Sequence, residues 1–322
     1  MERTTVEAPA YQDGYDLISA LKKEVGKVII GQEYMVDRII TGLLTGGHIL
    51  LEGVPGLAKS LAASAVARAV SADFKRIQFT PDLLPADILG TEIYNQKTGE
   101  FNIKKGPIFS NIILADEINR SPAKAQSALL EAMQEKQVSI GEVTYPLDDP
   151  FLVIATQNPL EQQGTYPLPE AQQDRFMLKL VVGYPSRDEE KDIIKRYASD
   201  ESAVPVIAPV LSREDIAAIR RAVDKVYVDA KIENYVLDIV FKTRAPSRYI
   251  ACGASPRASL NLIKAAKCRA YMSRRDFVSP DDIKALAFDV LRHRVLLSYE
   301  AEAEDITAES LITDILEAVN LP

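Results

Sequence analysis

The stretch Gly53-Val54-Pro55-Gly56-Leu57-Ala58-Lys59-Ser60 lies between an apolar run, His48-Ile49-Leu50-Leu51, and an alanine-rich segment with helical periodicity, residues 61–70. A strand, a glycine-bearing loop, Lys-Ser and a helix form the context in which such a motif binds nucleotide phosphates. Glycines let backbone N–H groups face phosphate oxygens, and the helix N-terminus adds partial positive charge. The motif predicts that Lys59 contacts the β- and γ-phosphates and that the Ser60 hydroxyl binds Mg²⁺. Ala58 departs from the usual pattern, which has glycine before the lysine, and an ordinary strand-to-helix turn is the alternative interpretation.

A second motif, Asn111-Ile112-Ile113-Leu114-Ala115-Asp116-Glu117, is an apolar strand that ends in two adjacent carboxylates. We expect Asp116 to hold Mg²⁺, directly or through water, and Glu117 to polarise the attacking water as a general base. A strand that ends in a polar turn is the alternative, but it does not explain why Asp-Glu follows a phosphate loop. Together the two motifs predict ATP binding and Mg²⁺-dependent hydrolysis to ADP.

The composition is that of a globular protein. The 322 residues suggest about two domains, and 47% of them are hydrophobic and 26% charged. No apolar run approaches the ~20 residues that cross a membrane, and the first residues do not resemble a secretory signal, so we expect a cytoplasmic protein. The net charge of −8 argues against non-specific nucleic-acid binding. Arg269, Arg274 and Arg275 are the best candidates for a local basic patch.

Short apolar segments alternate with helical segments in the first part of the chain. We predict strands at 48–52, 74–79, 111–115, 151–156 and 177–182. This alternation is typical of an α/β fold with a parallel sheet covered on both faces, in which ligands bind at the carboxyl ends of the strands. Beyond residue 186 the pattern is mainly helical. We therefore expect a nucleotide-binding domain over residues 1–186 and a helical domain over residues 187–322.

Two segments do not fit a minimal core of this kind. Residues 80–110 contain several prolines and glycines with short alternating pieces between them, and residues 137–150 predict a hairpin that turns at Gly141-Glu142. Insertions between core elements are candidates for contacts with partners, although many are surface decoration.

The motifs resemble those of the MoxR group of AAA+ ATPases over nearly the whole chain. The resemblance is carried by the phosphate loop with its Ala58 and by these further motifs: Leu114-Ala115-Asp116-Glu117-Ile118-Asn119-Arg120, Gln126-Ser127-Ala128-Leu129-Leu130-Glu131-Ala132-Met133, Ala155-Thr156-Gln157-Asn158-Pro159, Glu170-Ala171-Gln172-Gln173-Asp174-Arg175-Phe176 and Gly253-Ala254-Ser255-Pro256-Arg257. The resemblance implies an αβα ATPase domain followed by a small helical lid, with the nucleotide between them. It also implies a homo-oligomeric ring, usually a hexamer, and a chaperone-like role in maturing or activating protein complexes. Partners with von Willebrand factor A domains are usual in this group.

The resemblance also implies roles for individual residues. Asn158 matches the residue that helps to orient the attacking water, with an Asn-Pro turn as the alternative interpretation. Arg175 matches the arginine finger that enters the neighbouring subunit's site, and its alternative is an exposed arginine paired with Asp174. Arg257 matches the lid arginine that contacts the γ-phosphate. The predicted catalytic residues are Lys59, Glu117, Asn158, Arg175 and Arg257, and the predicted metal ligands are Ser60 and Asp116. The predicted nucleotide-binding residues are Ile30, Gly31, Gln32, Gly53, Val54, Pro55, Gly56, Leu57, Ala58, Lys59, Ser60, Leu61 and Arg257.

Other functions fit the same architecture. A DNA-directed AAA+ motor is one, and the acidic composition argues against it. A subunit like that of magnesium chelatase, which drives metal insertion into a tetrapyrrole, is another, and gene neighbours would distinguish it. A switch that binds ATP without turnover is a third, and the presence of Glu117, Asn158 and Arg175 argues against it.

Overall fold

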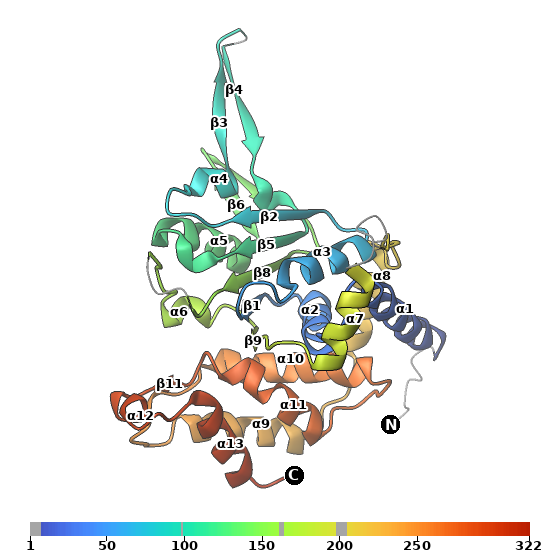
Figure 1. Cartoon of the computed structure of the whole chain (residues 1–322), viewed down its shortest axis with the longest axis vertical. Helices are drawn as coiled ribbons and strands as arrows, with labels where there is room; N and C mark the ends of the chain where they lie inside the picture. The colour runs from blue at the N-terminus through green and yellow to red at the C-terminus, as the bar shows by residue number, and fades with distance from the viewer. Residues whose placement is uncertain (1–7, 98, 161–163, 198–204) are drawn as a thin grey trace.

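A five-stranded parallel sheet lies at the centre of the first part of the chain (Figure 1). The computed structural model describes residues 8–97, 99–160, 164–197 and 205–322. The strands lie in the order β2 (Phe74–Gln78), β5 (Ile112–Asp116), β8 (Leu152–Gln157), β1 (Ile49–Glu52) and β9 (Leu178–Val181). Each end of each predicted strand is within one residue of the observed end. The predicted parallel sheet is confirmed.

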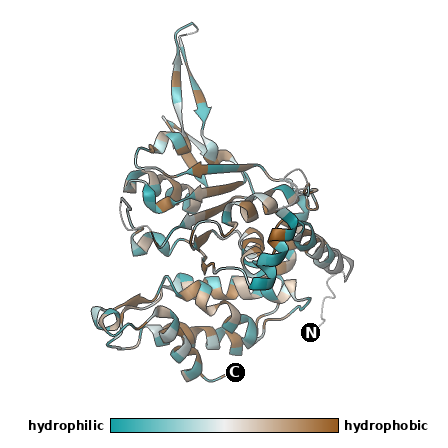
Figure 2. Ribbon diagram, viewed as in Figure 1, coloured by the Kyte–Doolittle hydropathy of each residue, from teal (hydrophilic) through white to brown (hydrophobic). Residues whose placement is uncertain are grey.

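Alternate residues of each strand pack on opposite faces of the sheet, as the period of two requires. Ile49 and Leu51 join the hydrophobic cluster of one face, whereas Leu50 joins the cluster of the other. The first face is covered by α1 (Ala8–Gly26), α2 (Glu33–Thr45) and α3 (Lys59–Ala69), and the second by α5 (Ala123–Glu135). The central strands are accordingly hydrophobic in Figure 2. The αβα layering is therefore as predicted.

His48 fixes the position where β1 begins. It is buried, its Nε2–H donates to the carbonyl of Met133 (3.1 Å), and its Nδ1 accepts from the N–H of Val153 (3.0 Å). Burial, the largest cause, lowers the pKa of His48 from 6.5 to about 4. The imidazole is therefore neutral in the folded protein at neutral pH, and it links α5 to β8.

We expect this neutral histidine to make the fold sensitive to mild acid. As pH falls below 6.5 the unfolded chain binds a proton at residue 48, while the folded chain does not until about pH 4, so folding stability is lost over that interval. The loss is about 1.4 kcal/mol for each pH unit. Urea unfolding of wild type and His48→Gln at pH 7 and pH 5 tests this, because glutamine can make similar hydrogen bonds without titrating. If the difference in free energy of unfolding between the two proteins is the same at pH 7 and pH 5, His48 does not cause a loss of stability in mild acid.

Both predicted insertions are hairpins or contain one. Residues 80–110 form α4 (Pro85–Leu89), a hairpin of β3 (Gly90–Asn95) and β4 (Glu100–Lys105), and the turn η1 (Pro107–Phe109). This hairpin projects away from the sheet in Figure 1. The second hairpin pairs β6 (Gln137–Ile140) with β7 (Val143–Pro146) and turns at Gly141-Glu142, as predicted.

Helices dominate the rest of the chain. The principal ones are α7 (Arg187–Tyr197), α8 (Arg213–Asp224), α9 (Ala230–Thr243), α10 (Pro256–Met272), α11 (Pro280–Leu291) and α13 (Ala308–Ala318). The smaller elements are α12 (Tyr299–Ala303) and the strand pair β10 (Ile250–Cys252) and β11 (Leu296–Leu297). Within the described ranges, none of the helices has both the length and the apolar character that a membrane span needs.

The first two of these helices contact elements from the beginning of the chain. The hydroxyl of Tyr197 in α7 donates to the carbonyl of Val28 (2.6 Å), and α8 packs against α1, α2 and α10. The domain boundary near residue 186 stays a prediction.

Candidate active site

The phosphate loop joins β1 to α3, and three of its residues explain its shape. Gly56 and Ala58 have positive φ angles of 86° and 56°, and a Cβ atom at Gly53 would lie 2.9 Å from the carbonyl oxygen of Val182. Positive φ strains residues other than glycine, which is why glycine is usual where this chain has Ala58. Lys59 is the first residue of α3, and its ammonium group donates to the carbonyl of Gly53.

Lys59 lies near three carboxylates. Burial, the largest cause, lowers its pKa, whereas the negative charges of Asp116, Glu117 and Glu52 act in the opposite direction. Ser60 follows Lys59 in the first turn of α3 and is half-buried. Lys59, which Ser60 follows in α3, and the carboxylates that end β5 thus lie together at the carboxyl edge of the sheet.

Polar side chains from two neighbouring strands hold these carboxylates. The hydroxyl of Thr156 at the end of β8 donates to Asp116 Oδ1 (2.6 Å) and accepts from the N–H of Glu117 (2.9 Å). Asp116 Oδ2 accepts from Arg76 Nη2 (2.6 Å) on β2, and Glu117 Oε2 accepts from Gln78 Nε2 (2.9 Å). None of these three partners is evident from the sequence, although all follow from the parallel pairing of β2, β5 and β8.

Glu117 has a backbone conformation that few residues adopt. Its φ of 56° and ψ of 50° are left-handed, and its carboxylate also pairs with Arg120 (3.2 Å) in the turn η2 (Ile118–Arg120). Such strain is usual where a side chain must be aimed at a ligand. Together with the Gln78 contact, it fixes the direction of the Glu117 carboxylate.

Asn158 follows β8, the strand between β1 and β5, and it is buried. Its Oδ1 accepts from the N–H of Leu160 (3.1 Å), which is the local bond expected of an Asn-Pro turn. The turn is therefore present, and the role of Asn158 in orienting water stays a prediction.

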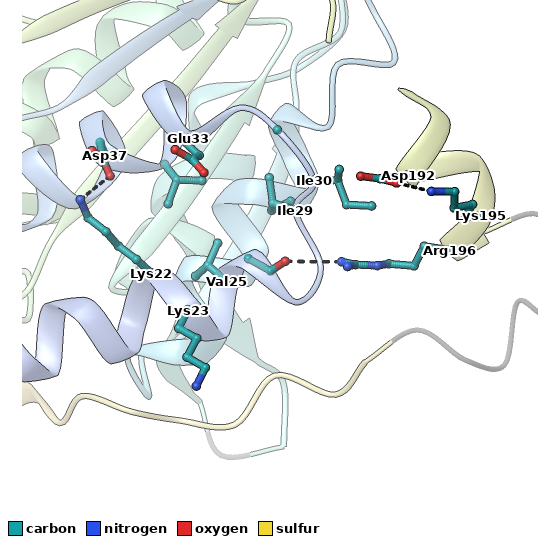
Figure 3. Close-up of a pocket in the computed structure, with 13 residues that line it drawn as sticks. Lys22, Lys23, Val25, Ile29, Ile30, Glu33, Asp37, Asp192, Lys195 and Arg196 are labelled. Atoms are coloured by element: carbon teal, nitrogen blue, oxygen red, sulfur yellow. Dashed lines mark hydrogen bonds and ion pairs between the residues drawn. The ribbon is translucent and has the colours of Figure 1, made fainter. Parts of the chain in front are cut away.

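The segment Ile30-Gly31-Gln32 lies close to the phosphate loop. Gln32 has a φ of 58° and donates from Nε2 to the carbonyl of Gly183 (3.0 Å), the residue after Val182, which approaches Gly53. Ile30 and Gly31 line a pocket of about 830 Å³ between α1, α2 and α7 (Figure 3). Lys22–Asp37 and Lys195–Asp192 pairs lie at its rim.

Arg175 lies elsewhere. It follows α6 (Glu170–Gln173) and precedes the amino end of β9, and it lines a groove of about 380 Å³ along α5 with Ser127, Glu131, Gln134, Glu135 and Gln172. The alternative interpretation, an exposed arginine paired with Asp174, does not match these contacts: Arg175 is half-buried, and Asp174 accepts from Arg294 (2.8 Å). Among the residues that the structure describes, none forms an ion pair with Arg175.

Arg257 lies beside the segment that carries Arg175. It is the second residue of α10, its Nε is 3.9 Å from Asp174 Oδ2, and its side chain is 44% exposed. Ser255, which caps α10, donates to both carboxylate oxygens of Asp174 at 3.0 Å. The predicted site residues therefore form two groups, one at the carboxyl edge of the sheet and one around Asp174.

Comparisons with known proteins agree with the motifs. Residues 48–178 match the ATPase family associated with various cellular activities (AAA), and residues 243–315 match the AAA lid domain. Chaperone MoxR1 of Mycobacterium tuberculosis is 50% identical over 93% of this chain and 81% of that protein. Protein MoxR of Methylorubrum extorquens is 29% identical over 96% of both. A crystal structure from Cytophaga hutchinsonii, 51% identical, superposes with a TM-score of 0.91 over 98% of this chain and 97% of its own. The chain belongs to the MoxR family of AAA ATPases.

Proposed function

We propose that this protein is a Mg²⁺-dependent ATPase that works as a hexameric ring, with each ATP site formed by two adjacent subunits. Membership of the AAA family implies ATP binding and hydrolysis and suggests an oligomer. The observation that carries the composite site is the position of the arginines. Arg175 precedes the amino end of β9, whereas the phosphate loop follows the carboxyl end of β1, which pairs with β9 in parallel. These ends are about 10 Å apart along the strands, so Arg175 and its own phosphate loop lie at opposite edges of the sheet.

One subunit supplies the phosphate and metal ligands. The backbone N–H groups of residues 53–58 and the Lys59 ammonium group would bind the phosphates, with Ile30-Gly31-Gln32 on the adenine side. Ser60 and Asp116 offer the hydroxyl and carboxylate oxygens that suit Mg²⁺, which would neutralise phosphate charge when bound. Glu117 would take the proton of the attacking water.

The adjacent subunit supplies the cations. Arg175 follows Asp174 in the sequence, and Arg257 lies 3.9 Å from the Asp174 carboxylate. We assign both arginines to the neighbour's site, where they would stabilise the charge that develops on the phosphate oxygens. The guanidinium group suits this role because it stays charged and can bind two oxygens at once.

Replacing Lys59 with alanine should abolish ATP binding or nearly so. The ammonium group is the only cation that the phosphate loop itself contains, and its removal leaves the phosphate charge uncompensated. Isothermal titration with a non-hydrolysable ATP analogue measures the effect. Lys104→Ala, on the exposed hairpin, is the control and should bind as wild type does. Unchanged affinity in Lys59→Ala would remove this lysine from the site.

We further propose that the ring remodels protein complexes as a chaperone, by analogy with the M. tuberculosis relative of that name, and that its partners carry von Willebrand factor A domains. Glu117→Gln, which should hold ATP without hydrolysing it, is the bait for affinity capture. The control is the double variant Lys59→Ala/Glu117→Gln, which should not bind ATP. Partners of this class should appear only with the ATP-bound bait, and identical captures with both baits would contradict the proposal.

Double-stranded DNA should not stimulate hydrolysis at physiological salt. The chain carries a net charge of −8, and the candidate basic patch is neutralised in the structure: Arg269 and Arg275 pair with Asp282, and Arg274 pairs with Asp16. Affinity for DNA depends on free cations that displace counterions. The test is ATP turnover with and without duplex DNA at several salt concentrations. A several-fold, salt-sensitive stimulation would favour the DNA-motor alternative.

A further inference from the structure

The Arg294 side chain forms hydrogen bonds with the backbone on both sides of Arg175. It lies in the turn after α11, and its side chain is 1% exposed. Its Nε donates to Asp174 Oδ1 (2.8 Å), Nη2 donates to the carbonyls of Asp174 (3.0 Å) and Phe176 (2.6 Å), and Nη1 donates to the carbonyl of Met177 (3.2 Å). The residues immediately before and after Arg175 are therefore bonded to one buried guanidinium group.

The Asp174 carboxylate extends this connection to Arg257. Besides Arg294, it accepts from the hydroxyl of Ser255 at 3.0 Å and lies 3.9 Å from Arg257 Nε. The same hydroxyl accepts from the N–H of Arg257 (3.3 Å) at the start of α10. One carboxylate thus connects the helix that carries Arg257 to the segment that carries Arg175.

Stability alone is a poor explanation for this arrangement. Burial, the largest cause, lowers the pKa of Arg294, and only Asp174 opposes it. A buried ion pair can often be replaced by apolar residues without loss of stability. An apolar residue cannot bind one carboxylate oxygen and the three carbonyls of residues 174–177 in fixed directions, as the planar guanidinium group does.

We propose that Arg294 and Asp174 are positioning residues that hold Arg175 and Arg257 as one unit, presented to the active site of the neighbouring subunit. This inference rests on the proposed composite site. Arg257 and Arg294 belong to the matched lid, and Arg175 to the matched ATPase region. A movement of the lid against β9 must therefore either break these bonds or carry Arg175 with it.

Arg294→Gln tests the proposal. We expect affinity for a non-hydrolysable ATP analogue with Mg²⁺ to equal that of wild type, because the subunit's own phosphate loop is intact. We expect turnover to fall about 10²-fold, the loss typical of a reacting group displaced by roughly 1 Å. The matched control is Arg292→Gln. Arg292 comes from the same turn and joins the lid to the carbonyl of Lys179 in β9 (2.8 Å) without bonding residues 174–177. The Arg292→Gln variant should therefore keep its turnover within a few-fold of wild type.

Mixed rings separate positioning from general damage to the lid. Glu117→Gln subunits carry a sound Arg175, so they should restore turnover at the intact Glu117 of an adjacent Arg294→Gln subunit. Arg175→Ala subunits should not, because neither chain then presents a correctly positioned Arg175. A variant whose lid has simply collapsed would lose ATP affinity and would gain nothing from either partner.

Three results would overturn the proposal: wild-type turnover in Arg294→Gln, loss of ATP affinity in that variant, or recovery with Arg175→Ala subunits. If Arg294→Gln does not fold, Asp174→Asn serves, since it keeps the side-chain volume and removes the carboxylate, and the same outcomes apply to it. Mixtures of Arg175→Ala with Glu117→Gln show whether the composite site itself is correct. If that mixture recovers turnover but the mixture of Arg294→Gln with Glu117→Gln does not, the composite site stands and only the positioning role of Arg294 is contradicted.

Discussion

Glu117→Gln should bind ATP and hydrolyse it ~10²–10⁴-fold more slowly than wild type, the usual contribution of a general base. Glutamine keeps the size of the side chain, and its Oε1 can still accept the hydrogen bond from Gln78 that the carboxylate accepts at 2.9 Å. The left-handed backbone at this position is unchanged by the substitution. The variant therefore loses the base without losing the geometry of the site.

Two measurements decide the result. A non-hydrolysable ATP analogue should bind with wild-type affinity, and phosphate release in single-turnover conditions should show the loss of rate. The control is Glu142→Gln, which removes an exposed carboxylate from the β6–β7 turn and should leave both quantities unchanged. Turnover near the wild-type rate in Glu117→Gln would mean that another group activates the water.

The elements of the ATPase region could be predicted because local patterns determine them. Buried strands give continuous apolar runs, such as Ile112-Ile113-Leu114-Ala115, and the polar residues that end each strand show where the site edge lies. The left-handed conformation of Ala58 shows why glycine is expected there. The hairpin within residues 137–150 could also be predicted from the local sequence, and it turns at Gly141-Glu142.

The partners of the site residues could not be predicted in this way, because they are distant in sequence. The hydrogen bond from Thr156 to Asp116 joins residues 40 positions apart in the sequence, and the bond from Arg294 to Asp174 joins residues 120 positions apart. The periodicity of a sequence does not indicate contacts between such distant residues. A threonine in a strand or an arginine after a helix has many ordinary roles. They follow only from the order β2-β5-β8-β1-β9 and from the packing of α11 against β9.

The division of the site residues into two groups also needed the fold. The resemblance to the family gave a role to Arg257 but did not show its surroundings. The structure places Arg257 beside Asp174 and therefore beside Arg175. This proximity supports assigning both arginines to the site of the adjacent subunit. For the same reason, a variant of either arginine should regain turnover when it is mixed with Glu117→Gln subunits.

Arg175→Ala should bind ATP normally and lose ~10³–10⁵ in turnover, as expected for an arginine finger, which is roughly 4–7 kcal/mol of barrier. Arg175 lies in the groove along α5, where none of the described side chains is ion-paired to it, so its removal should leave the subunit's own fold and phosphate loop intact. The measurements are analogue affinity and steady-state turnover. Glu135→Gln, in the same groove, is the control and should remain active.

Mixing Arg175→Ala with Glu117→Gln should restore activity that neither variant has. An Arg175→Ala subunit retains Glu117, and an adjacent Glu117→Gln subunit supplies the missing arginine, so about a quarter of the junctions in randomly mixed rings are complete. Mixtures of wild type with Glu117→Gln show independently whether mixed rings can turn over. If those are active and subunits exchange, yet the two variants together stay inactive, Arg175 does not act in the neighbouring site. Full activity of Arg175→Ala alone would exclude the finger role altogether, because an arginine that stabilises the transferred phosphoryl group cannot be removed without raising the barrier.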